Sequence, residues 1–218
     1  MNKHKHEQIK PQELTRRQRE DARHRQEILD VALGLFSDKG FHNVSVKEIS
    51  QKAEFGLGTI YKFFGNKEGL YHSMVMERAT ECHAILKSAL IEHASAIKCL
   101  EEFIKGKIAF FQGNKAFIRL YLFETQGVKF SIRAGLEENI RKLHDDILGD
   151  LTGLFSRGIK DGVFKTDLPP RLLAVAFDGM STAVLVEWLE TGQEEPLSAK
   201  ILLNLFLGPV LVPGAIES

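Results

Sequence analysis

Residues 43–70, NVSVKEISQKAEFGLGTIYKFFGNKEGL, decide the fold that we predict for this chain. Ser45 followed three residues later by Glu48 forms a capping box, which signals the start of a helix. Residues 54–56 (Glu-Phe-Gly) should end that helix, because glycine permits backbone angles that stop a helix without steric cost. A second short helix is expected over residues 57–64. Helix, tight turn, helix is the helix-turn-helix pattern, whose second helix enters the DNA major groove.

The second of these helices has two different faces. Ile60 and Phe64 are four residues apart, so they share the face that is turned to a core. The other side carries Thr59, Tyr61 and Lys62, which offer a hydroxyl, a phenol and an ammonium. This combination suits a helix that contacts phosphates and base edges.

The pattern continues upstream to residue 28. Residues 28–70, ILDVALGLFSDKGFHNVSVKEISQKAEFGLGTIYKFFGNKEGL, resemble the ILxAAxxLFxxxGFxxxTVxxIAxxAGVSxGTxYxYFxxKExL pattern of the TetR family of bacterial transcriptional repressors. The specific resemblance covers about residues 20–75. It implies an all-α protein with an N-terminal three-helix DNA-binding domain and a larger C-terminal helical domain for ligand binding and dimerisation.

The resemblance implies that the starts of three helices contact DNA. By position, the DNA-binding residues would be Ser45, Lys47, Gly56, Leu57, Gly58, Thr59, Tyr61, Lys62 and Lys67. Ser45 and Lys47 are expected to meet phosphates at the entry to the first helix of the motif. Gly58 would remove a side chain where the recognition helix approaches the duplex.

The remaining assignments leave alternatives open. Thr59 and Lys62 are expected at base edges or neighbouring phosphates, and Tyr61 and Lys67 at phosphates, Lys67 beside a helix N-terminus. Tyr61 also fits half-buried packing under the first helix. Lys67, like Lys47, also fits a solvated surface charge.

Two positions depart from the family pattern. Gly56 stands where the family usually has Ser or Thr, and Leu57 where it often has a polar residue. A hydroxyl that would contact phosphate is therefore missing, and Leu57 can offer a base only an apolar contact such as a thymine methyl. The alternative function is a helical ligand- or partner-binding module with weakened sequence-specific DNA recognition.

Charge is unevenly distributed over the 218 residues, although the net charge is zero. Residues 1–67 hold 13 Lys and Arg and 9 Asp and Glu, a net charge of +4, which suits contact with phosphates. Residues 1–20 lack an apolar period and are interpreted as a flexible basic arm. We expect the DNA-binding domain over residues 21–70, with its helix-turn-helix at about 45–64, and the second domain over 71–218.

Periodicity and breakers predict helices throughout the chain. The expected ranges are 21–38, the two of the motif, 67–93 with Asn66 as its cap, 95–112, 114–126, 131–161, 169–191 and 198–208. Residues 171–190 are apolar around most of their circumference, so that helix should be buried on more than one side. Together with residues 201–207, it is expected to form a four-helix bundle in a two-fold dimer, as paired recognition helices require.

Phenylalanines dominate the second domain, where the family resemblance implies a small-molecule effector. The candidate ligand-binding residues are Phe103, Phe110, Phe111, Phe117, Tyr121, Phe123, Glu124, Phe155, Phe177 and Asp178. Further polar candidates are Gln112, Arg119 and His144. An apolar cavity with few polar groups is the usual form of a ligand site, so a hydrophobic or amphipathic effector is expected. Aromatic residues at helical spacing are more often plain core.

Other classes have little support in the sequence. It lacks a G-x-S-x-G elbow, an H-E-x-x-H motif, a paired C-x-x-C and a P-loop, so we expect no enzyme, no cofactor and no metal site. There is no secretory signal, and the apolar run 201–216 is broken by Asn, Gly and Pro. Cys82 and Cys99 are interpreted as buried free thiols. The sequence predicts a cytoplasmic protein without a membrane segment.

Overall fold

The computed structural model describes residues 15–91, 95–126, 132–192 and 197–208, with the side chains of 123–126 and 132–137 excepted. Within these ranges the chain is all-α. The elements are α1 (Arg16–Lys39), the 3-10 turn η1 (Phe41–Asn43), α2 (Val46–Lys52), α3 (Leu57–Phe64), α4 (Lys67–Ile91), α5 (Ala96–Gly113), α6 (Lys115–Gln126), α7 (Ile132–Lys160), α8 (Pro170–Thr191) and α9 (Ala199–Leu207). Apart from the start of α1, every helix begins and ends within two residues of the predicted range.

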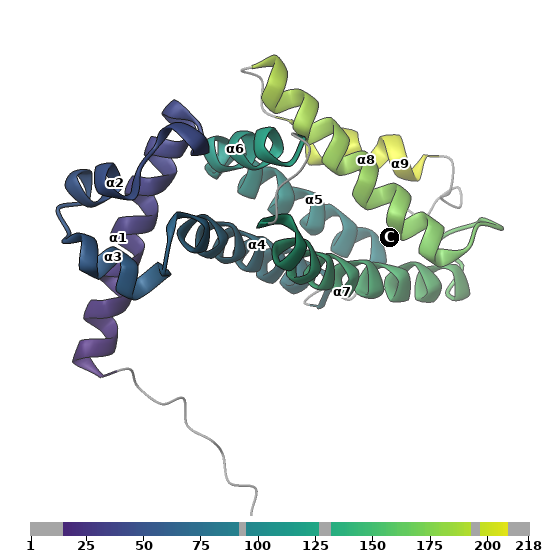
Figure 1. The fold of residues 1–218 in the computed structure, drawn as a ribbon. Coiled ribbons are helices and arrows are strands. Elements are labelled where there is room, and N and C mark those ends of the chain that lie inside the picture. Colours follow the sequence, from purple (N-terminus) through teal and green to yellow (C-terminus); the bar gives the residue numbers. More distant parts are fainter. Residues whose placement is uncertain (1–14, 92–94, 127–131, 193–196, 209–218) are drawn as a thin grey trace, which may run out of the picture.

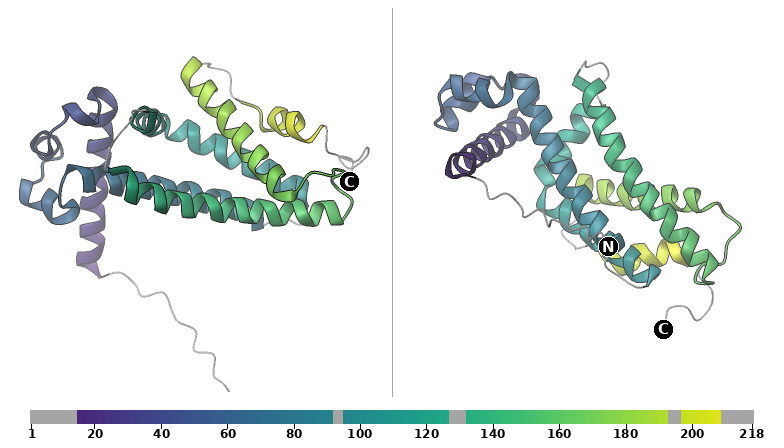
Figure 2. Two further views of the ribbon diagram at one scale, coloured as in Figure 1. Left: turned by 45° about the vertical axis from the view of Figure 1, so that its right-hand side comes forward. Right: turned by 90° about the horizontal axis from the view of Figure 1, so that it is seen from below.

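The helices form two groups joined by α4. Figure 1 shows α1, α2 and α3 gathered at one end of the molecule, with α4 leading from them into the larger group of α5 to α9. Helices α4 and α7 lie side by side along much of their length, as both views in Figure 2 show. Helix α8 packs on α7, and α9 packs on α5.

Helix α1 begins five residues earlier than predicted. The backbone N–H of Gln18 donates to Thr15 Oγ1, and the Gln18 side chain accepts from the Thr15 backbone N–H, so the two residues form a capping box. The prediction that residues up to 20 belong to an arm is therefore wrong for residues 16–20, because this cap makes them helical. Residues 1–14 of the predicted arm lie outside the described residues.

The turn between α2 and α3 uses a different residue from the one predicted. Gly56 has ordinary extended angles, φ −64° and ψ 144°, whereas Glu54 has φ 58°. Glu54 is thus the residue in the left-handed region, which costs a side-chain-bearing residue free energy. Two hydrogen bonds across the turn hold it there: Ser50 Oγ donates to the carbonyl of Phe55 at 2.6 Å, and the Phe55 N–H donates to the carbonyl of Ser50 at 3.1 Å.

The caps around α2 and α4 were predicted in part. Ser45 Oγ accepts from the Glu48 N–H at 3.1 Å, but the Glu48 carboxylate pairs with Lys39 of α1, so the box is half formed. Asn66 Oδ1 accepts from the Gly69 N–H, which confirms the predicted cap of α4. Gly40 ends α1 with φ 79° and ψ 152°, a backbone conformation with positive φ that glycine adopts without steric cost.

Aromatic packing joins the small domain to α4. The rings of Phe36, Phe41 and Tyr71 contact one another, with centroids 5.1–6.3 Å apart. Leu70 and Tyr71 are buried in this cluster although they belong to the first turn of α4. The far half of α4 buries Leu86 in the second domain. Helix α4 therefore contributes buried side chains to the cores of both domains.

Helix α8 is the most apolar long helix of the described chain. By length and composition alone it could cross a membrane, which the sequence analysis did not anticipate. Its inner side includes Phe177, Asp178 and Ser181, all buried against neighbouring helices. A helix with buried polar groups and partners on one side has the character of a core helix of a water-soluble domain, so its composition is weak support for a membrane span.

Helix α6 connects α8 to the small domain. Arg119 Nη2 donates to the carbonyl of Leu189 at 2.8 Å, and the Lys115 ammonium lies 4.7 Å from the centre of the Trp188 ring. On its other side, α6 packs against α1, where Ser37 Oγ lies 3.5 Å from the carbonyl of Ala116. The end of α8 is thus linked through one short helix to α1.

The left-handed conformation of Glu54 yields a test of the turn. Glu54→Gly should stabilise the small domain by about 1 kcal/mol, because glycine adopts positive φ without the clash of a Cβ atom. Denaturant unfolding followed by circular dichroism measures the change. Glu54→Ala is the matched control: it removes the same charge but keeps Cβ, so an equal gain from both variants would contradict the explanation.

Candidate DNA-binding surface and effector cavity

Helix α3 exposes the face that was predicted to contact DNA. Ile60 and Phe64 are buried and fix the helix to α1 and α4, and the Arg25 guanidinium of α1 lies 5.4 Å from the centre of the Phe64 ring. On the outer side Tyr61 is 51% exposed and Lys62 is exposed. Tyr61 is therefore not packed under α1, which was the alternative to a DNA contact.

The glycines near the start of α3 are not required by the protein itself. A Cβ atom built on Gly58 has no neighbour within 4 Å, and one on Gly56 has only the hydroxyl of Thr59 at 4.0 Å. Gly56 is the N-cap of α3 and provides no side-chain cap. Leu57 beside them is 39% exposed, so this end of the helix presents an open, uncharged surface.

Three other residues that were predicted to bind DNA, Ser45, Lys47 and Thr59, differ in how available their side chains are to a duplex. Lys47 is exposed at the start of α2, where Ser45 Oγ is already used as the helix cap. Thr59 is half-buried on α3. A serine that accepts one hydrogen bond keeps its O–H free to donate, so Ser45 can still reach a phosphate.

Lys67 is held inside the protein. Its ammonium donates to the carbonyls of Phe41 and Val44 at 2.9 and 3.0 Å and lies 4.4 Å from the centre of the Phe41 ring. Two of its three N–H groups are thus taken by the chain segment that precedes α2. The geometry favours a structural role, in which Lys67 ties the start of α4 to the helix-turn-helix, over the phosphate clamp that was predicted.

The second domain contains a cavity of about 210 Å³ between α4, α5, α7 and α8. Its walls are mainly apolar and include one long side of α4. The lining residues are Ala79, Cys82, His83, Leu86, Lys107, Phe111, Ile140, Leu143, His144, Ile147, Asp178 and Thr182. Burial raises the pKa of the Cys82 thiol to about 11, so that thiol stays protonated at neutral pH.

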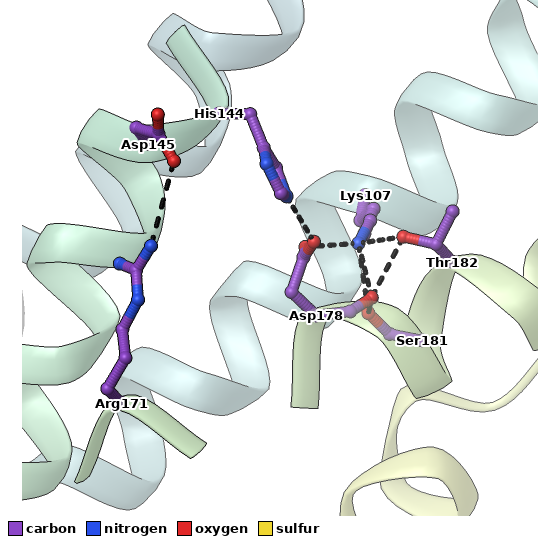
Figure 3. Close-up of polar contacts among 7 residues, drawn as sticks. All are labelled: Lys107, His144, Asp145, Arg171, Asp178, Ser181 and Thr182. Atoms are coloured by element: carbon purple, nitrogen blue, oxygen red, sulfur yellow. Dashed lines mark hydrogen bonds and ion pairs between the residues drawn. The ribbon is translucent and has the colours of Figure 1, made fainter. Parts of the chain in front are cut away.

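A buried ammonium, Lys107, joins three helices at one wall of this cavity (Figure 3). Its Nζ donates to Asp178 Oδ1 at 2.6 Å, Thr182 Oγ1 at 2.7 Å, Ser181 Oγ at 3.0 Å and the Asp178 carbonyl at 3.1 Å. The second carboxylate oxygen of Asp178 lies 3.0 Å from Nε2 of His144 on α7. Four acceptors for three N–H groups leave Lys107 fully satisfied by the protein.

The charges in this network support one another. Burial by itself would raise the pKa of the Asp178 carboxyl, but the His144 hydrogen bond and the Lys107 charge lower this pKa to about 2. Burial lowers the pKa of Lys107, and the Asp178 carboxylate opposes that change. The hydrogen bond to Asp178 raises the pKa of His144. Asp178 is therefore ionised, and His144 uses Nε2–H to donate to it.

Most of the predicted ligand-binding aromatics lie elsewhere. Of the predicted set, Phe111 and Asp178 line the cavity, as does His144 among the further candidates. Phe103, Phe155 and Phe177 are completely buried and pack with one another at centroid distances of 5.6–6.1 Å, so they form core and not cavity wall.

The rest of the predicted set is also away from the cavity or outside the described side chains. Phe110 is buried on α5, and Phe117 stacks on Tyr121 with centroids 6.0 Å apart. The side chains of Phe123 and Glu124 lie outside the described residues. Sequence reasoning missed Lys107, Cys82, His83 and Thr182, because a lysine or threonine in a helical sequence usually marks the surface.

Two larger hollows have a different character. One, of about 620 Å³, lies between the end of α4, the start of α5 and α7 and is walled partly by Asp150, Arg157 and Asp161. The other, of about 640 Å³, lies between α1 and α6 and is lined in part by Asp38, Lys39 and Arg119. Both have more polar walls than the smaller cavity. The 210 Å³ cavity is the candidate effector site because it combines apolar walls with one buried polar cluster.

Comparison with known proteins agrees with this architecture. Residues 28–74 match the family described as bacterial regulatory proteins, tetR family. The fatty acid metabolism regulator protein of Bacillus subtilis is 24% identical over 173 residues, covering 79% of this chain and 87% of the relative. The HTH-type transcriptional repressor KstR2 of Mycobacterium tuberculosis is 24% identical over 191 residues, covering 86% and 90%.

Solved structures share the fold along nearly their whole length. The transcriptional regulator FadR from Bacillus subtilis, determined in complex with stearoyl-CoA, superimposes with a TM-score of 0.70 at 23% identity, covering 83% of this chain and 96% of FadR. The ketosteroid transcriptional regulator KstR2 of Mycobacterium tuberculosis gives a TM-score of 0.67 at 18% identity, covering 86% and 95%. The fold and the motif define a helix-turn-helix transcriptional regulator. The chain belongs to the TetR family.

Removing one partner of the buried Lys107–Asp178 ion pair should cause a large loss of stability. Lys107→Met should cost about 3 kcal/mol, because it leaves the Asp178 carboxylate buried without its ammonium partner. Adding Asp178→Asn to this variant should restore part of the loss. Lys105→Met on the same helix is the matched control: Lys105 pairs with Glu101 and Glu102 on the surface, and its loss should leave the unfolding midpoint unchanged. Equal effects of the two methionine variants in urea denaturation would refute the role given to Lys107.

Proposed function

We propose that the protein is a dimeric transcriptional repressor that binds a palindromic operator and is released from it by a small amphipathic effector. The observation that carries this proposal is the outer face of α3, which exposes Tyr61 and Lys62 while Ile60 and Phe64 anchor the helix from inside. A rigid short helix with a phenol and an ammonium outward can lie in the major groove and bond to phosphates.

The glycines at the start of α3 support close approach to DNA. Since nothing in the protein crowds the Cβ position of Gly58, the fold gives no reason for a glycine there. A duplex lying against this end of the helix would give such a reason, because it would leave no room for a side chain. Leu57, exposed beside Gly58, would then contact an apolar group such as a thymine methyl.

The dimer is proposed through α8 and α9. Four aliphatic side chains on these helices are between 46% and 67% exposed: Leu172, Val175, Ile201 and Leu205. Large aliphatic groups clustered on one surface favour association, and a four-helix bundle made with a second copy would bury them. A two-fold dimer would also present two α3 helices to two operator half-sites.

The proposed release of DNA runs through α4. One side of this helix lines the cavity, and its first half is fixed to α1 by Arg25–Glu77 at 2.8 Å and Arg78–Asp30 at 3.7 Å. An effector that pushes α4 outward would move α1 and α3 with it and change the spacing between the two recognition helices. A coupling free energy of about 1–3 kcal/mol changes operator affinity about 5- to 150-fold.

The effector is proposed to have an apolar body. The walls of the cavity are mostly apolar, and two similar proteins are described with molecules that have a large apolar part: FadR in complex with stearoyl-CoA, and KstR2 as a ketosteroid transcriptional regulator. We also propose a cytoplasmic location, because a regulator that binds an operator needs access to the DNA. We further propose that the boundary between the domains lies near residue 70, at the end of the first turn of α4.

A second candidate function keeps the effector site but not the operator. Gly56 leaves α3 without a side-chain cap, and Leu57 replaces a polar contact, so sequence-specific recognition would be weak. Such a module would bind the operator no more tightly than an unrelated duplex at the same salt concentration, whereas an operator-binding repressor prefers the operator.

The proposed DNA surface is tested with the DNA directly upstream of the protein's own coding region. In a gel shift the wild type should give specific retardation, and Tyr61→Ala and Lys62→Ala should each weaken binding by at least about 10-fold, because each removes a contact to the duplex. Lys160→Ala, an exposed lysine at the far end of α7, is the matched control for loss of one positive charge. Retention of full affinity by both α3 variants would exclude α3 as the recognition helix.

The proposed dimer interface is tested by sedimentation velocity. Val175→Asp and Ile201→Asp should each convert a dimer to monomer at micromolar concentration, since each places a charge in a buried apolar interface. Ile91→Asp is the control, because Ile91 is 68% exposed but lies at the end of α4, away from α8 and α9. If only Ile91→Asp dissociated the dimer, the interface would lie on a surface other than α8 and α9.

A further inference from the structure

Most polar groups of the effector cavity belong to one hydrogen-bonded cluster on α5, α7 and α8. Lys107, Asp178 and Thr182 lie together where α5 meets α8, and His144 on α7 extends the same cluster (Figure 3). Because the His144 side chain is 52% exposed, its position is taken as the mouth of the cavity. The opposite wall is made by α4 and is mostly apolar, with His83 already paired with Asp146 at 2.7 Å. A ligand must therefore make its polar contact at one end and apolar contacts along the rest.

Most of the polar wall is already occupied by internal bonds. Lys107 has more acceptors than N–H groups, and both carboxylate oxygens of Asp178 are used, one by Lys107 and one by His144. The hydroxyl of Thr182 bonds both to the Lys107 ammonium and to the Asp178 carbonyl. Lys107 and Thr182 can therefore donate to a ligand only if they give up a bond that the protein has already made, and Asp178 can only accept.

His144 differs from the other groups. Its Nε2 bonds to Asp178, while Nδ1 has no protein partner among the described residues. The side chain is 52% exposed, so the second ring nitrogen is accessible at the cavity mouth. Because the Asp178 carboxylate lies behind the ring, a proton on Nδ1 is favoured, and the ring then presents a positively charged N–H donor to the ligand.

We infer that the effector is a small amphipathic carboxylic acid whose carboxylate is received by His144, with Asp178 positioning the ring. This inference rests on the proposed effector cavity and names the chemistry of its ligand. A carboxylate complements a charged N–H donor, and the bond is charge-assisted. The apolar body would lie against Leu86, Phe111 and Ile147.

The size and charges around the mouth favour the free acid over a coenzyme A thioester. The cavity volume of about 210 Å³ is below the range of about 300–1,000 Å³ typical of sites for drug-sized ligands. The thioester has no carboxylate at that position, and its phosphates need unpaired cations. Lys87, next to the lining residue Leu86 in the sequence, is paired with Asp146 and Asp150, and Arg171 lies 3.6 Å from Asp145, the residue after His144.

The test uses three probes of equal chain length on the full-length protein without DNA: octanoate, octanol and octanoyl-CoA. Isothermal titration should show octanoate binding at least about 10-fold more tightly than the other two, the size expected for one charge-assisted hydrogen bond. His144→Ala should remove this preference while leaving octanol affinity unchanged. His144→Gln keeps a donor to Asp178 without the charge and should also lose most of the preference.

Lys142→Ala is the matched control: it removes an exposed cation that pairs with Glu138 and lies two residues from His144, on another face of the same helix, so octanoate binding should be unchanged. Equal affinity for octanoate and octanol, tighter binding of octanoyl-CoA, or an unchanged preference in His144→Ala would each overturn the inference. Operator binding is measured separately on the same samples. Loss of octanoate selectivity with intact operator binding rejects the ligand class alone, and selective octanoate binding without operator binding rejects the repressor alone.

Discussion

A single continuous helix, α4, belongs to both domains, and the other parts of the structure are placed relative to it. Its first turn contributes Leu70 and Tyr71 to the small core around Phe36 and Phe41, and its second half contributes Leu86 and Leu90 to the larger core. A helix without a break transmits a displacement from one end to the other, because packed interiors do not deform continuously. A change at the cavity wall therefore cannot remain confined to the second domain.

The two walls of the cavity differ in how readily they can move. The wall formed by α5, α7 and α8 is fixed by the Lys107–Asp178–His144 network, in which separating the charges would leave them buried and unpaired. The α4 wall includes Ala79, Cys82 and Leu86. Its ion pairs to α7 are partly exposed to solvent, so rearranging them costs little free energy. A ligand that needs more room should displace α4 and leave the polar wall in place.

Sequence reasoning predicted those features whose causes are local. The ranges of α2 and α3 follow from the cap at Ser45 and from Ile60 and Phe64 four residues apart, so they could be derived. The left-handed Glu54 could not, because it is imposed by the bonds of Ser50 across the turn. The cavity was also beyond reach: Phe103, Phe155 and Phe177 carry the same aromatic signal whether they line a hollow or fill a core. The burial of Lys107 depends on partners about 70 residues away in the sequence.

The contact between Lys115 and Trp188 has a spectroscopic consequence. The chain contains one tryptophan, and the Lys115 ammonium lies 4.7 Å from the centre of its ring. The emission energy of an indole depends on nearby charge, so the fluorescence of the unlabelled protein reports on the distance between α6 and the end of α8. Because α6 also packs on α1, this emission monitors the junction between the two domains from within the native sequence.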